Sequence, residues 1–171
     1  MSRTTIIDVT DATGDVLEPA WLARAESVHR ELRQRLPPDY VAKMRRVFAG
    51  GGRMCVAVDR DAVVGIGVYR VYENTFDGRM MYVDDLITTE SERSAGVGKA
   101  LMEHMQVLAR EASCASYTLD SGTQRVRAHK FYLREGMTIT GFHFEKPRSS
   151  QWSSRATTRS KSAVDCARTM D

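Results

Sequence analysis

The chain has 171 residues, 42% of them hydrophobic and 27% charged, which suits one domain with a buried core and leaves too little for two. Its net charge of +3 comes from residues 147–171, which hold five basic and two acidic residues, whereas residues 1–146 hold 20 of each. A domain that binds nucleic acid normally carries a basic excess of its own, so we expect no nucleic-acid partner.

The first part of the sequence predicts one strand and two helices. Residues 5–9 suit a short strand, and apolar residues at helical spacing predict a helix over residues 17–35. The pair Pro37-Pro38 ends this helix, and a second helix follows over residues 40–48. Three consecutive glycines at 50–52 then break the chain.

The middle of the sequence predicts strands. Residues 54–58 and 63–71 flank Asp59-Arg60-Asp61, which is a hairpin signal. A polar loop over residues 72–78 leads to the next strand, at 80–88. These segments therefore predict at least three strands that pair in antiparallel fashion.

Helices and strands alternate in the last part of the domain. The sequence predicts an amphipathic helix at 97–113, a strand at 117–120, a helix at 126–134 and a closing strand at 138–144 with a kink at Gly141. Antiparallel strands followed by this alternation imply an α/β fold, with a mixed, mostly antiparallel sheet and helices on both faces.

The segment at 147–171 is rich in Ser, Thr and Arg and shows almost no apolar periodicity. We expect a disordered tail after one domain over residues 1–146. No apolar run reaches the roughly 18 residues that a membrane helix needs, and residues 1–8 lack the apolar stretch of a signal peptide. We therefore expect a cytoplasmic protein without a membrane partner.

The chain has three cysteines, Cys55, Cys114 and Cys166. An odd number, without a Cys-x-x-Cys or His-x-x-His spacing, argues against a disulfide framework and a structural zinc site. We expect buried free thiols and no metal centre.

The junction between the strand at 80–88 and the helix at 97–113 carries the clearest chemical signal. There the run Arg93-Ser94-Ala95-Gly96-Val97-Gly98-Lys99 opens the helix with Arg-x-x-Gly-x-Gly. Glycines let the backbone approach a ligand, and the free N–H groups of a first helical turn favour an anion such as pyrophosphate. Arg93 and Lys99 add positive charge. The pattern is neither a Rossmann fingerprint nor a Walker loop, and a tight turn at a helix start is the alternative interpretation.

A second segment, Ala128-x-x-Phe131-Tyr132-x-x-x-Gly136-Met137, lies on the predicted helix at 126–134, with Gly136 as its C-terminal cap. Together with Arg93–Gly98 it resembles the GCN5-related N-acetyltransferase (GNAT) family, whose members transfer an acetyl group from acetyl-CoA to amines. The resemblance covers about residues 5–146. It implies a GNAT-like fold and acetyl-CoA as cosubstrate.

Within this family, residues 125–146 look most like the bacterial aminoalkylphosphonate N-acetyltransferases. They share an Arg-x-x-Ala-His-[Arg/Lys]-Phe-Tyr-Leu-Arg-Glu-Gly run and an aromatic-rich closing strand. One position departs from the wider family, because many members have Asn where this chain has Arg125. Near-relatives with other substrates share the run, so it does not fix the acceptor.

The resemblance also implies roles for individual residues. Tyr132 matches the general acid beside the CoA sulfur, or a hydroxyl that only positions the sulfur. Residues Leu86, Ile87 and Thr88 match the central strand, whose backbone contacts the pantetheine and the acetyl carbonyl. The loop Arg93–Lys99 matches the pyrophosphate site. In the family this strand separates from its neighbour, and a β-bulge would explain such a separation.

A proton must leave the acceptor, because an alkyl amine with a pKa near 10.4 is only about one part in a thousand neutral at pH 7. Asp84 and Asp85 are the candidate groups, through a relayed water or by attracting the cation, although a regular strand sends neighbours to opposite faces. A solvated or capping role is the alternative for both. Asp120 is a weaker candidate, and His129 reads as structural or CoA-adjacent.

We expect the first helices and the loop at 72–78, with Glu73 and Asp77, to form the acceptor site. The leading hypothesis is acetylation of a small-molecule amine by direct attack. The alternatives are a protein lysine or N-terminal acetyltransferase and a non-catalytic acetyl-CoA-binding module. Family members commonly dimerise, so the resemblance implies a homodimer as a possible assembly.

Overall fold

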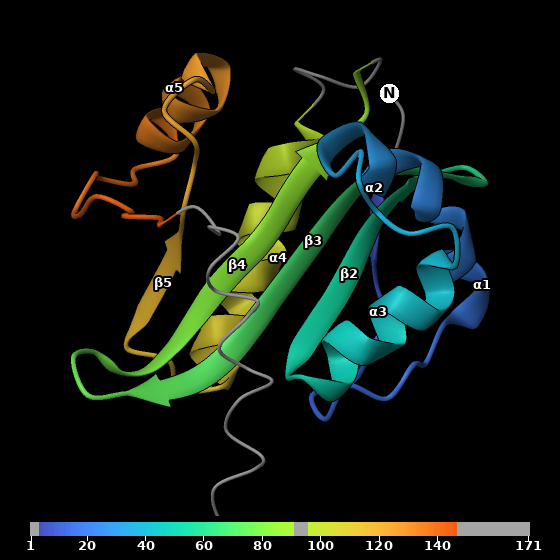
Figure 1. Ribbon diagram of the computed structural model, residues 1–171, viewed down its shortest axis with the longest axis horizontal. Coiled ribbons are helices and arrows are strands. Elements are labelled where there is room, and N and C mark those ends of the chain that lie inside the picture. Colours follow the sequence, from blue (N-terminus) through green and yellow to red (C-terminus); the bar gives the residue numbers. More distant parts are fainter. Residues whose placement is uncertain (1–3, 91–95, 147–171) are drawn as a thin grey trace, which may run out of the picture. The chain divides into compact units, whose positions relative to one another are not determined.

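The computed structural model describes residues 4–90 and 96–146 (Figure 1). The chain divides into one compact unit that ends at Thr138 and a second that begins at Ile139, and every assigned helix and strand lies in the first unit. The motif residues Arg93–Ala95, Cys166 and the tail at 147–171 lie outside the described residues, so what the sequence predicts for them stays a prediction.

A five-stranded sheet forms the centre of the first unit. Its strands follow one another in space in their sequence order, and neighbours are antiparallel except for the last, parallel pair. The strands are β1 (Thr5–Asp8), β2 (Gly52–Asp59), β3 (Ala62–Asn74), β4 (Gly78–Thr88) and β5 (Ser116–Leu119). The predicted α/β class, with a mostly antiparallel mixed sheet, is confirmed.

Helices cover both faces of the sheet, with α1–α3 on one face and α4 on the other (Figure 1). The assigned helices are α1 (Pro19–Arg24), α2 (Glu26–Leu32), α3 (Tyr40–Ala49), α4 (Val97–Glu111) and α5 (Val126–Arg134). The single helix predicted over residues 17–35 is thus divided at Ala25. Asp39 caps α3 by accepting a hydrogen bond from the Ala42 N–H at 2.9 Å. Within the described ranges, no helix combines the length and apolarity needed to cross a bilayer.

Alternation along β2 supplies core residues to both faces. Met54 and Val56 pack with the helices α1–α3, whereas Cys55 and Ala57 pack with α4. Cys55 is a fully buried free thiol, as the sequence predicts, and Cys114 is a partly buried one.

Two glycines of β3 let α4 lie close to the sheet. A Cβ atom at Gly65 would lie 2.9 Å from Leu101 Cδ1, and one at Gly67 would lie 2.8 Å from Met105 Sδ. A larger residue at either position would therefore displace side chains that α4 packs against the sheet. The close approach fixes the position of α4, and with it the helix N-terminus that follows β4.

The predicted closing strand at 138–144 is wrong, because residues 138–146 are irregular. A strand needs a partner for its hydrogen bonds and one continuous apolar face. Ile139 alternates out of phase with Phe142 and Phe144, and all three side chains are exposed. The segment therefore offers no single face that could hold it on a sheet.

The predicted polar loop at 72–78 is shorter than expected, because β3 continues to Asn74 and β4 begins at Gly78. The Asn74 side chain accepts hydrogen bonds from the N–H groups of Phe76 and Asp77, at 2.9 and 2.7 Å, and so closes a tight turn. This turn lies at the end of β4 opposite to Asp85 (Figure 1).

Candidate active site

Strand β5 ends partway along the longer strand β4 (Figure 1). Their parallel pairing joins Met80–Val83 to Ser116–Leu119, beyond which β4 continues beside β3 alone. In the described residues, the backbone groups of 84–88 that point away from β3 therefore have no sheet partner. An extended ligand can bind such groups through main-chain hydrogen bonds. The backbone contacts predicted for Leu86-Ile87-Thr88 fit this opening.

A β-bulge lies in β4 directly after its last pair with β5. Val68 of β3 pairs with Asp85, but the next residue, Tyr69, pairs with Val83, so Asp84 is an extra residue in β4. In a regular strand Asp84 and Asp85 would point to opposite faces. The bulge instead allows both side chains to line one cavity, and so brings the two predicted carboxylates together.

The N-terminus of α4 meets the end of β4 and the helix α5. Gly96 precedes α4 in the left-handed conformation, with φ +85°, and a Cβ atom there would meet no atom of the described residues within 4 Å. A Cβ atom at Gly98 would lie 3.5 Å from Phe131 Cζ and 3.6 Å from Thr88 Cγ2. The first N–H groups of a helix lack internal partners and favour an anion. The structure therefore has an open, positively polarised helix end at the predicted pyrophosphate site.

Lys99, predicted to add charge to that site, also connects two helices. Its Nζ atom lies 3.4 Å from Glu135 Oε2 and 3.6 Å from Glu103 Oε1. The contact with Glu135 joins the first turn of α4 to the end of α5. Its charge is thus shared between these carboxylates and any bound anion.

Tyr132 lies on the last turn of α5, which ends at Arg134, and the predicted cap residue Gly136 follows with φ +84°. The Met137 N–H donates to the Tyr132 carbonyl at 3.0 Å and closes the helix end. The Tyr132 hydroxyl makes no hydrogen bond within the part of the chain that the structure describes. Burial raises the pKa of Tyr132, and the charge of Arg125 acts in the opposite direction. The phenol therefore stays protonated at neutral pH and is available as a donor.

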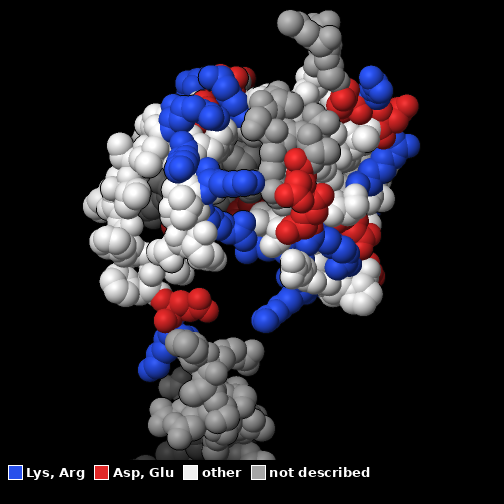
Figure 2. Space-filling model, turned by 90° about the horizontal axis from the view of Figure 1, so that it is seen from above, with Lys and Arg blue, Asp and Glu red and all other residues white. Residues whose placement is uncertain are grey.

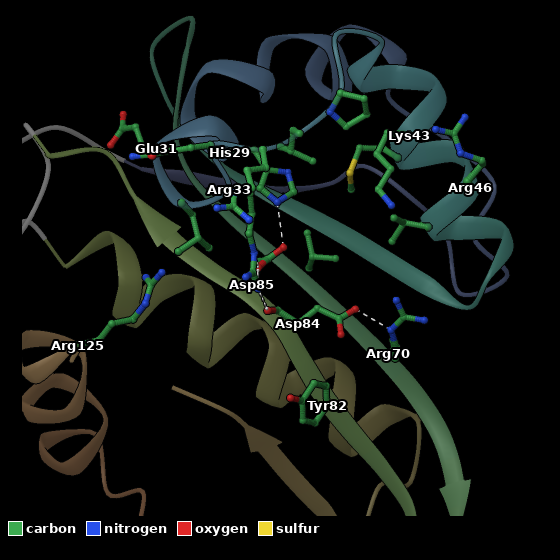
Figure 3. A pocket seen from close by; sticks show the side chains of 18 residues that line it. His29, Glu31, Arg33, Lys43, Arg46, Arg70, Tyr82, Asp84, Asp85 and Arg125 are labelled. Carbon is green, nitrogen blue, oxygen red and sulfur yellow. Dashed lines mark hydrogen bonds and ion pairs between the residues drawn. The ribbon is translucent and has the colours of Figure 1, made fainter. Parts of the chain in front are cut away.

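A cavity of about 1050 Å³ lies beside the two carboxylates (Figure 3). Helices α2 and α3, the loop between them and the central strands line it. Its charged lining residues are Glu31, Arg33, Arg35, Lys43, Arg46, Arg70, Asp84, Asp85 and Arg125. The first helices, predicted to form the acceptor site, line this cavity. The loop at 72–78, with Glu73 and Asp77, does not, because it lies at the other end of β4.

Asp85 is held by a buried hydrogen-bond chain. Its Oδ2 atom lies 3.0 Å from His29 Nε2, and His29 Nδ1 lies 3.0 Å from the Tyr40 hydroxyl. A carboxylate only accepts, so we assign the imidazole proton to Nε2 and the Tyr40 hydroxyl as donor to Nδ1. Burial raises the pKa of Tyr40, which keeps that hydroxyl protonated. Arg33 Nε donates to the other carboxylate oxygen at 2.6 Å.

Asp84 is less completely paired. Arg70 Nε donates to its Oδ2 atom at 2.7 Å, and Oδ1 accepts no hydrogen bond from the described residues. Burial raises the pKa of Asp84 although the bond from Arg70 lowers it, and the charge of Asp85 adds to the rise. Asp84 is thus a carboxylate with one open oxygen and an increased proton affinity.

The cavity has an excess of positive charge, since six Lys or Arg side chains line it against three Asp or Glu. Asp84 and Asp85 are already paired with Arg70 and Arg33. The side chains of Lys43 and Arg46 make no hydrogen bond or ion pair with any described residue. Basic side chains reach into the hollow of the face seen from above (Figure 2). The site can therefore hold a group with negative charge.

His29, Arg33 and Arg70 are site residues that the sequence alone did not reveal. His29 had one available signal, a polar residue beside Val28 on the apolar side of a predicted helix. Nothing in the sequence places Arg33 or Arg70 near a carboxylate 52 or 14 positions away. Only the packing of α2 and β3 against β4 brings them together.

The other candidates lie elsewhere. Asp120 accepts a hydrogen bond from the Tyr82 hydroxyl at 2.9 Å, and His129 Nε2 lies 3.0 Å from the Gly122 carbonyl oxygen. Neither of these two candidates lines the cavity.

Outside the cavity, one residue each from β1, β2 and α4 form a cluster of Asp8, Cys55 and His104. His104 Nε2 contacts Asp8 Oδ1 at 2.8 Å, and Cys55 lies near both, with the three possible metal-ligating atoms within 4.8 Å of one another. The hydrogen bond from Asp8 raises the pKa of His104. An ion pair accounts for the Asp8–His104 arrangement.

Comparison with known proteins assigns this architecture. Residues 18–137 match the acetyltransferase (GNAT) family. A curated relative from Bacillus subtilis (strain 168), described as uncharacterized N-acetyltransferase YhdJ, is 41% identical over 71 residues, which is 41% of this chain and 50% of the relative. The chain thus spans about half the length of the curated relative it matches.

Solved structures share the fold. An acetyltransferase from Trypanosoma brucei is 21% identical with a TM-score of 0.68, over 85% of this chain and 100% of that one. The aminoglycoside N-acetyltransferase AAC(6')-Iy in complex with CoA is 16% identical with a TM-score of 0.73, over 86% and 96%. With the family match over most of its length, the chain belongs to the GNAT family of acetyltransferases.

Proposed function

We propose that this protein transfers the acetyl group of acetyl-CoA to a primary amine of a small molecule, by direct attack in a ternary complex. One observation carries the proposal. The edge of β4 at 85–88 that faces away from β3 adjoins both the N-terminus of α4 at Gly96 and the cavity that Asp84 and Asp85 line. Holding both reactants at neighbouring sites removes much of the entropic barrier to attack.

The residues present fit acetyl-CoA. The free backbone groups of 86–88 suit the amides of a pantetheine arm, and the first N–H groups of α4 after Gly96 suit a diphosphate. Bound acetyl-CoA supplies a thioester, which is an activated acyl group with a thiolate as leaving group. The protein must then remove a proton from the acceptor ammonium and stabilise the negative charge on the departing thiolate.

Asp84 is the group that accepts the proton of the acceptor ammonium, directly or through water. Its Oδ1 atom is open in the described residues, whereas both oxygens of Asp85 accept hydrogen bonds from protein groups. Burial raises the pKa of Asp84, which brings the carboxylate closer to the range in which a general base works well. Asp85 instead keeps the cavity in shape through His29 and Arg33.

Tyr132 donates its hydroxyl proton, or a hydrogen bond, to the sulfur as the carbon–sulfur bond breaks. The nitrogen lone pair forms the new bond to the acetyl carbon, and the carbon–sulfur bond breaks with its electron pair on sulfur. The second nitrogen proton then leaves to give the neutral amide and replaces the proton that Tyr132 passes to the thiolate. Arg125 lines the acceptor cavity and opposes the burial-driven rise in the pKa of Tyr132. A cation at this position therefore eases donation from the phenol, in a chain that lacks the Asn of many relatives.

The acceptor carries a negatively charged group as well as its amine. Lys43 and Arg46 of α3 line the same cavity as Asp84 and have no partner among the described residues, and the Lys43 side chain extends toward it (Figure 3). An aminoalkylphosphonate or an aminocarboxylate has an ammonium at one end and an anion at the other, and so matches both groups. The likeness of residues 125–146 to aminoalkylphosphonate N-acetyltransferases supports the same acceptor class.

A thiol-release assay with acetyl-CoA and a panel of amines tests the proposal. The panel contains aminoalkylphosphonates, aminocarboxylates, polyamines, amino sugars and lysine peptides. We expect the highest kcat/KM for small amines that carry an anion. Turnover with peptides alone would indicate a protein acetyltransferase. Acetyl-CoA binding without release above background for every acceptor would indicate a binding module.

A further inference from the structure

Two buried hydroxyl groups have no hydrogen-bond partner among the described residues. They are the phenol of Tyr117 on β5 and the Oγ of Ser121, two residues beyond that strand. By contrast, the buried hydroxyls of Tyr40 and Thr10 are paired, because Tyr40 contacts His29 at 3.0 Å and Thr10 Oγ1 accepts from the Met54 N–H at 3.0 Å. Buried polar groups without partners are rare in folded proteins and need a specific explanation.

Tyr117 and Ser121 come shortly before and after the point where β5 ends and β4 continues without it. Tyr117 pairs with Met81 two positions before the last pair, Val83 and Leu119, and Ser121 follows Leu119 by two residues. The Tyr117 side chain packs with the cluster that faces α4. Tyr117 is therefore on the α4 side of the sheet, whereas the acceptor cavity lies among α2, α3 and the other face.

Tyr117 is also close to Tyr132. Burial raises the pKa of Tyr117, and the neighbouring Tyr132 phenol adds to the rise. Both phenols are therefore protonated donors at neutral pH. Tyr132 is the side chain proposed to serve the sulfur, so the unpartnered Tyr117 hydroxyl lies where the arm that carries the thioester would pass.

We propose that Tyr117 and Ser121 are ligands of acetyl-CoA, and that their hydroxyls hydrogen-bond the polar groups of its pantetheine arm. The inference rests on the proposed function and adds two side chains to a site otherwise made of backbone groups. An arm with amide and hydroxyl groups offers both donors and acceptors, which is what unpaired hydroxyls need. No described protein group pairs with either hydroxyl, so a ligand that supplies a partner gains the hydrogen bond without breaking one inside the protein.

The substitution Tyr117→Phe removes only the hydroxyl and makes two predictions of opposite sign. The free variant should melt at the wild-type temperature or about 2 °C above it, because a buried unsatisfied group is lost. Its Kd for acetyl-CoA, measured by calorimetry, should rise about 3- to 10-fold, because a ligand contact is lost. Ser121→Ala should change both quantities in the same directions.

Tyr40→Phe is the matched control, because it removes a buried hydroxyl that has a protein partner, His29. It should lower the melting temperature and leave the Kd for acetyl-CoA unchanged. A second probe, the adenosine bisphosphate part of the coenzyme without its arm, should bind wild type and Tyr117→Phe equally. If Tyr117→Phe weakens the binding of acetyl-CoA and of the adenosine bisphosphate probe by the same factor, the lost contact is not to the pantetheine arm. That result would overturn the inference.

The failures of the two proposals are distinguishable. Wild-type protein that binds no acetyl-CoA would overturn the proposed function and this inference together. Wild type that binds acetyl-CoA, with Tyr117→Phe and Ser121→Ala of equal affinity, would overturn the inference alone. A lower melting temperature for free Tyr117→Phe would also contradict it, since a hydroxyl already satisfied by ordered water would behave in that way.

Discussion

His29 Nε2 lies 3.0 Å from Asp85 Oδ2, and this hydrogen bond joins helix α2 to the bulged strand β4. Arg33, just beyond the same helix, binds the other oxygen of Asp85. The Asp85 carboxylate thus fixes α2 and the residue that follows it against β4, and both elements line the proposed acceptor cavity (Figure 3). The neighbouring Asp84 keeps an open oxygen, so adjacent residues in the sequence have separate tasks.

Asp85→Asn should destabilise the fold more than Asp84→Asn. The amide removes the charge that compensates Arg33 and offers His29 a weaker acceptor, so we expect the free energy of unfolding to fall by about 1–3 kcal/mol. Asp84 and Arg70 are both partly exposed, and their separation should cost less. Urea unfolding of the two variants checks the order. An equal loss would contradict the structural role of Asp85.

Asp84→Asn should act on the reaction rather than on cofactor binding. Loss of a general base lowers kcat/KM by about 100-fold, while calorimetry should find the Kd for acetyl-CoA unchanged. Weaker acetyl-CoA binding with normal turnover at saturation would exclude Asp84 as the proton acceptor.

The same variant tests a pH dependence. The base acts in its ionised form, and burial raises the pKa of Asp84 above its ordinary range. Wild-type kcat/KM should therefore fall as the pH decreases through that raised pKa. Asp84→Asn has no carboxylate to protonate, so its residual activity should lack this acid limb. An identical acid limb in both proteins would assign it to another group.

Lys43→Gln and Arg46→Gln should raise the KM of acceptors that carry an anion, by about 10-fold for each lost charge contact. The KM of an uncharged-tail amine of similar length should change little. Arg45→Gln is the control, because Arg45 lies on the same helix and is exposed but does not line the cavity. If all three variants lose affinity equally, the effect comes from net charge and not from a binding site.

Gly96→Asp and Gly96→Asn separate conformation from charge at the start of α4. Both residues tolerate the left-handed backbone of Gly96 better than other side chains do, and open space surrounds the position. Only Asp adds a negative charge where a diphosphate would bind. We expect the Kd for acetyl-CoA to be at least about 10-fold higher for Asp than for Asn, with similar stability of the two proteins. Equal affinities would contradict the diphosphate site.

Local patterns predicted most of the fold. The helix at 126–134 has the predicted bounds, because its apolar spacing and the glycine at 136 both act within a few residues. The glycine at 96 adopts the open turn that its motif requires. The closing strand at 138–144 could not be settled in this way, because a strand exists only when another segment pairs with it.

The acceptor site depends on long-range packing and was only partly predictable. The sequence identified Asp84 and Asp85 but not that they share one cavity, because the bulge depends on how β3 pairs with β4. His29 meets Asp85 from 56 positions away. Such contacts produce no periodic pattern in the sequence. The positively charged lining of the cavity could therefore not be predicted, because it depends on how α2 and α3 pack against the sheet.

Tyr132→Phe should lower kcat by about 100-fold and leave the Kd for acetyl-CoA unchanged, because the variant keeps the ring but cannot donate to the leaving thiolate. The alkaline limb supplies a second readout. Activity should fall as the pH rises through the pKa of Tyr132, and the charge of Arg125 lowers that pKa. Arg125→Gln should therefore move the alkaline limb to higher pH. A limb that stays in place in Arg125→Gln, or persists in Tyr132→Phe, would mean that another group titrates there and that the phenol does not serve as the donor.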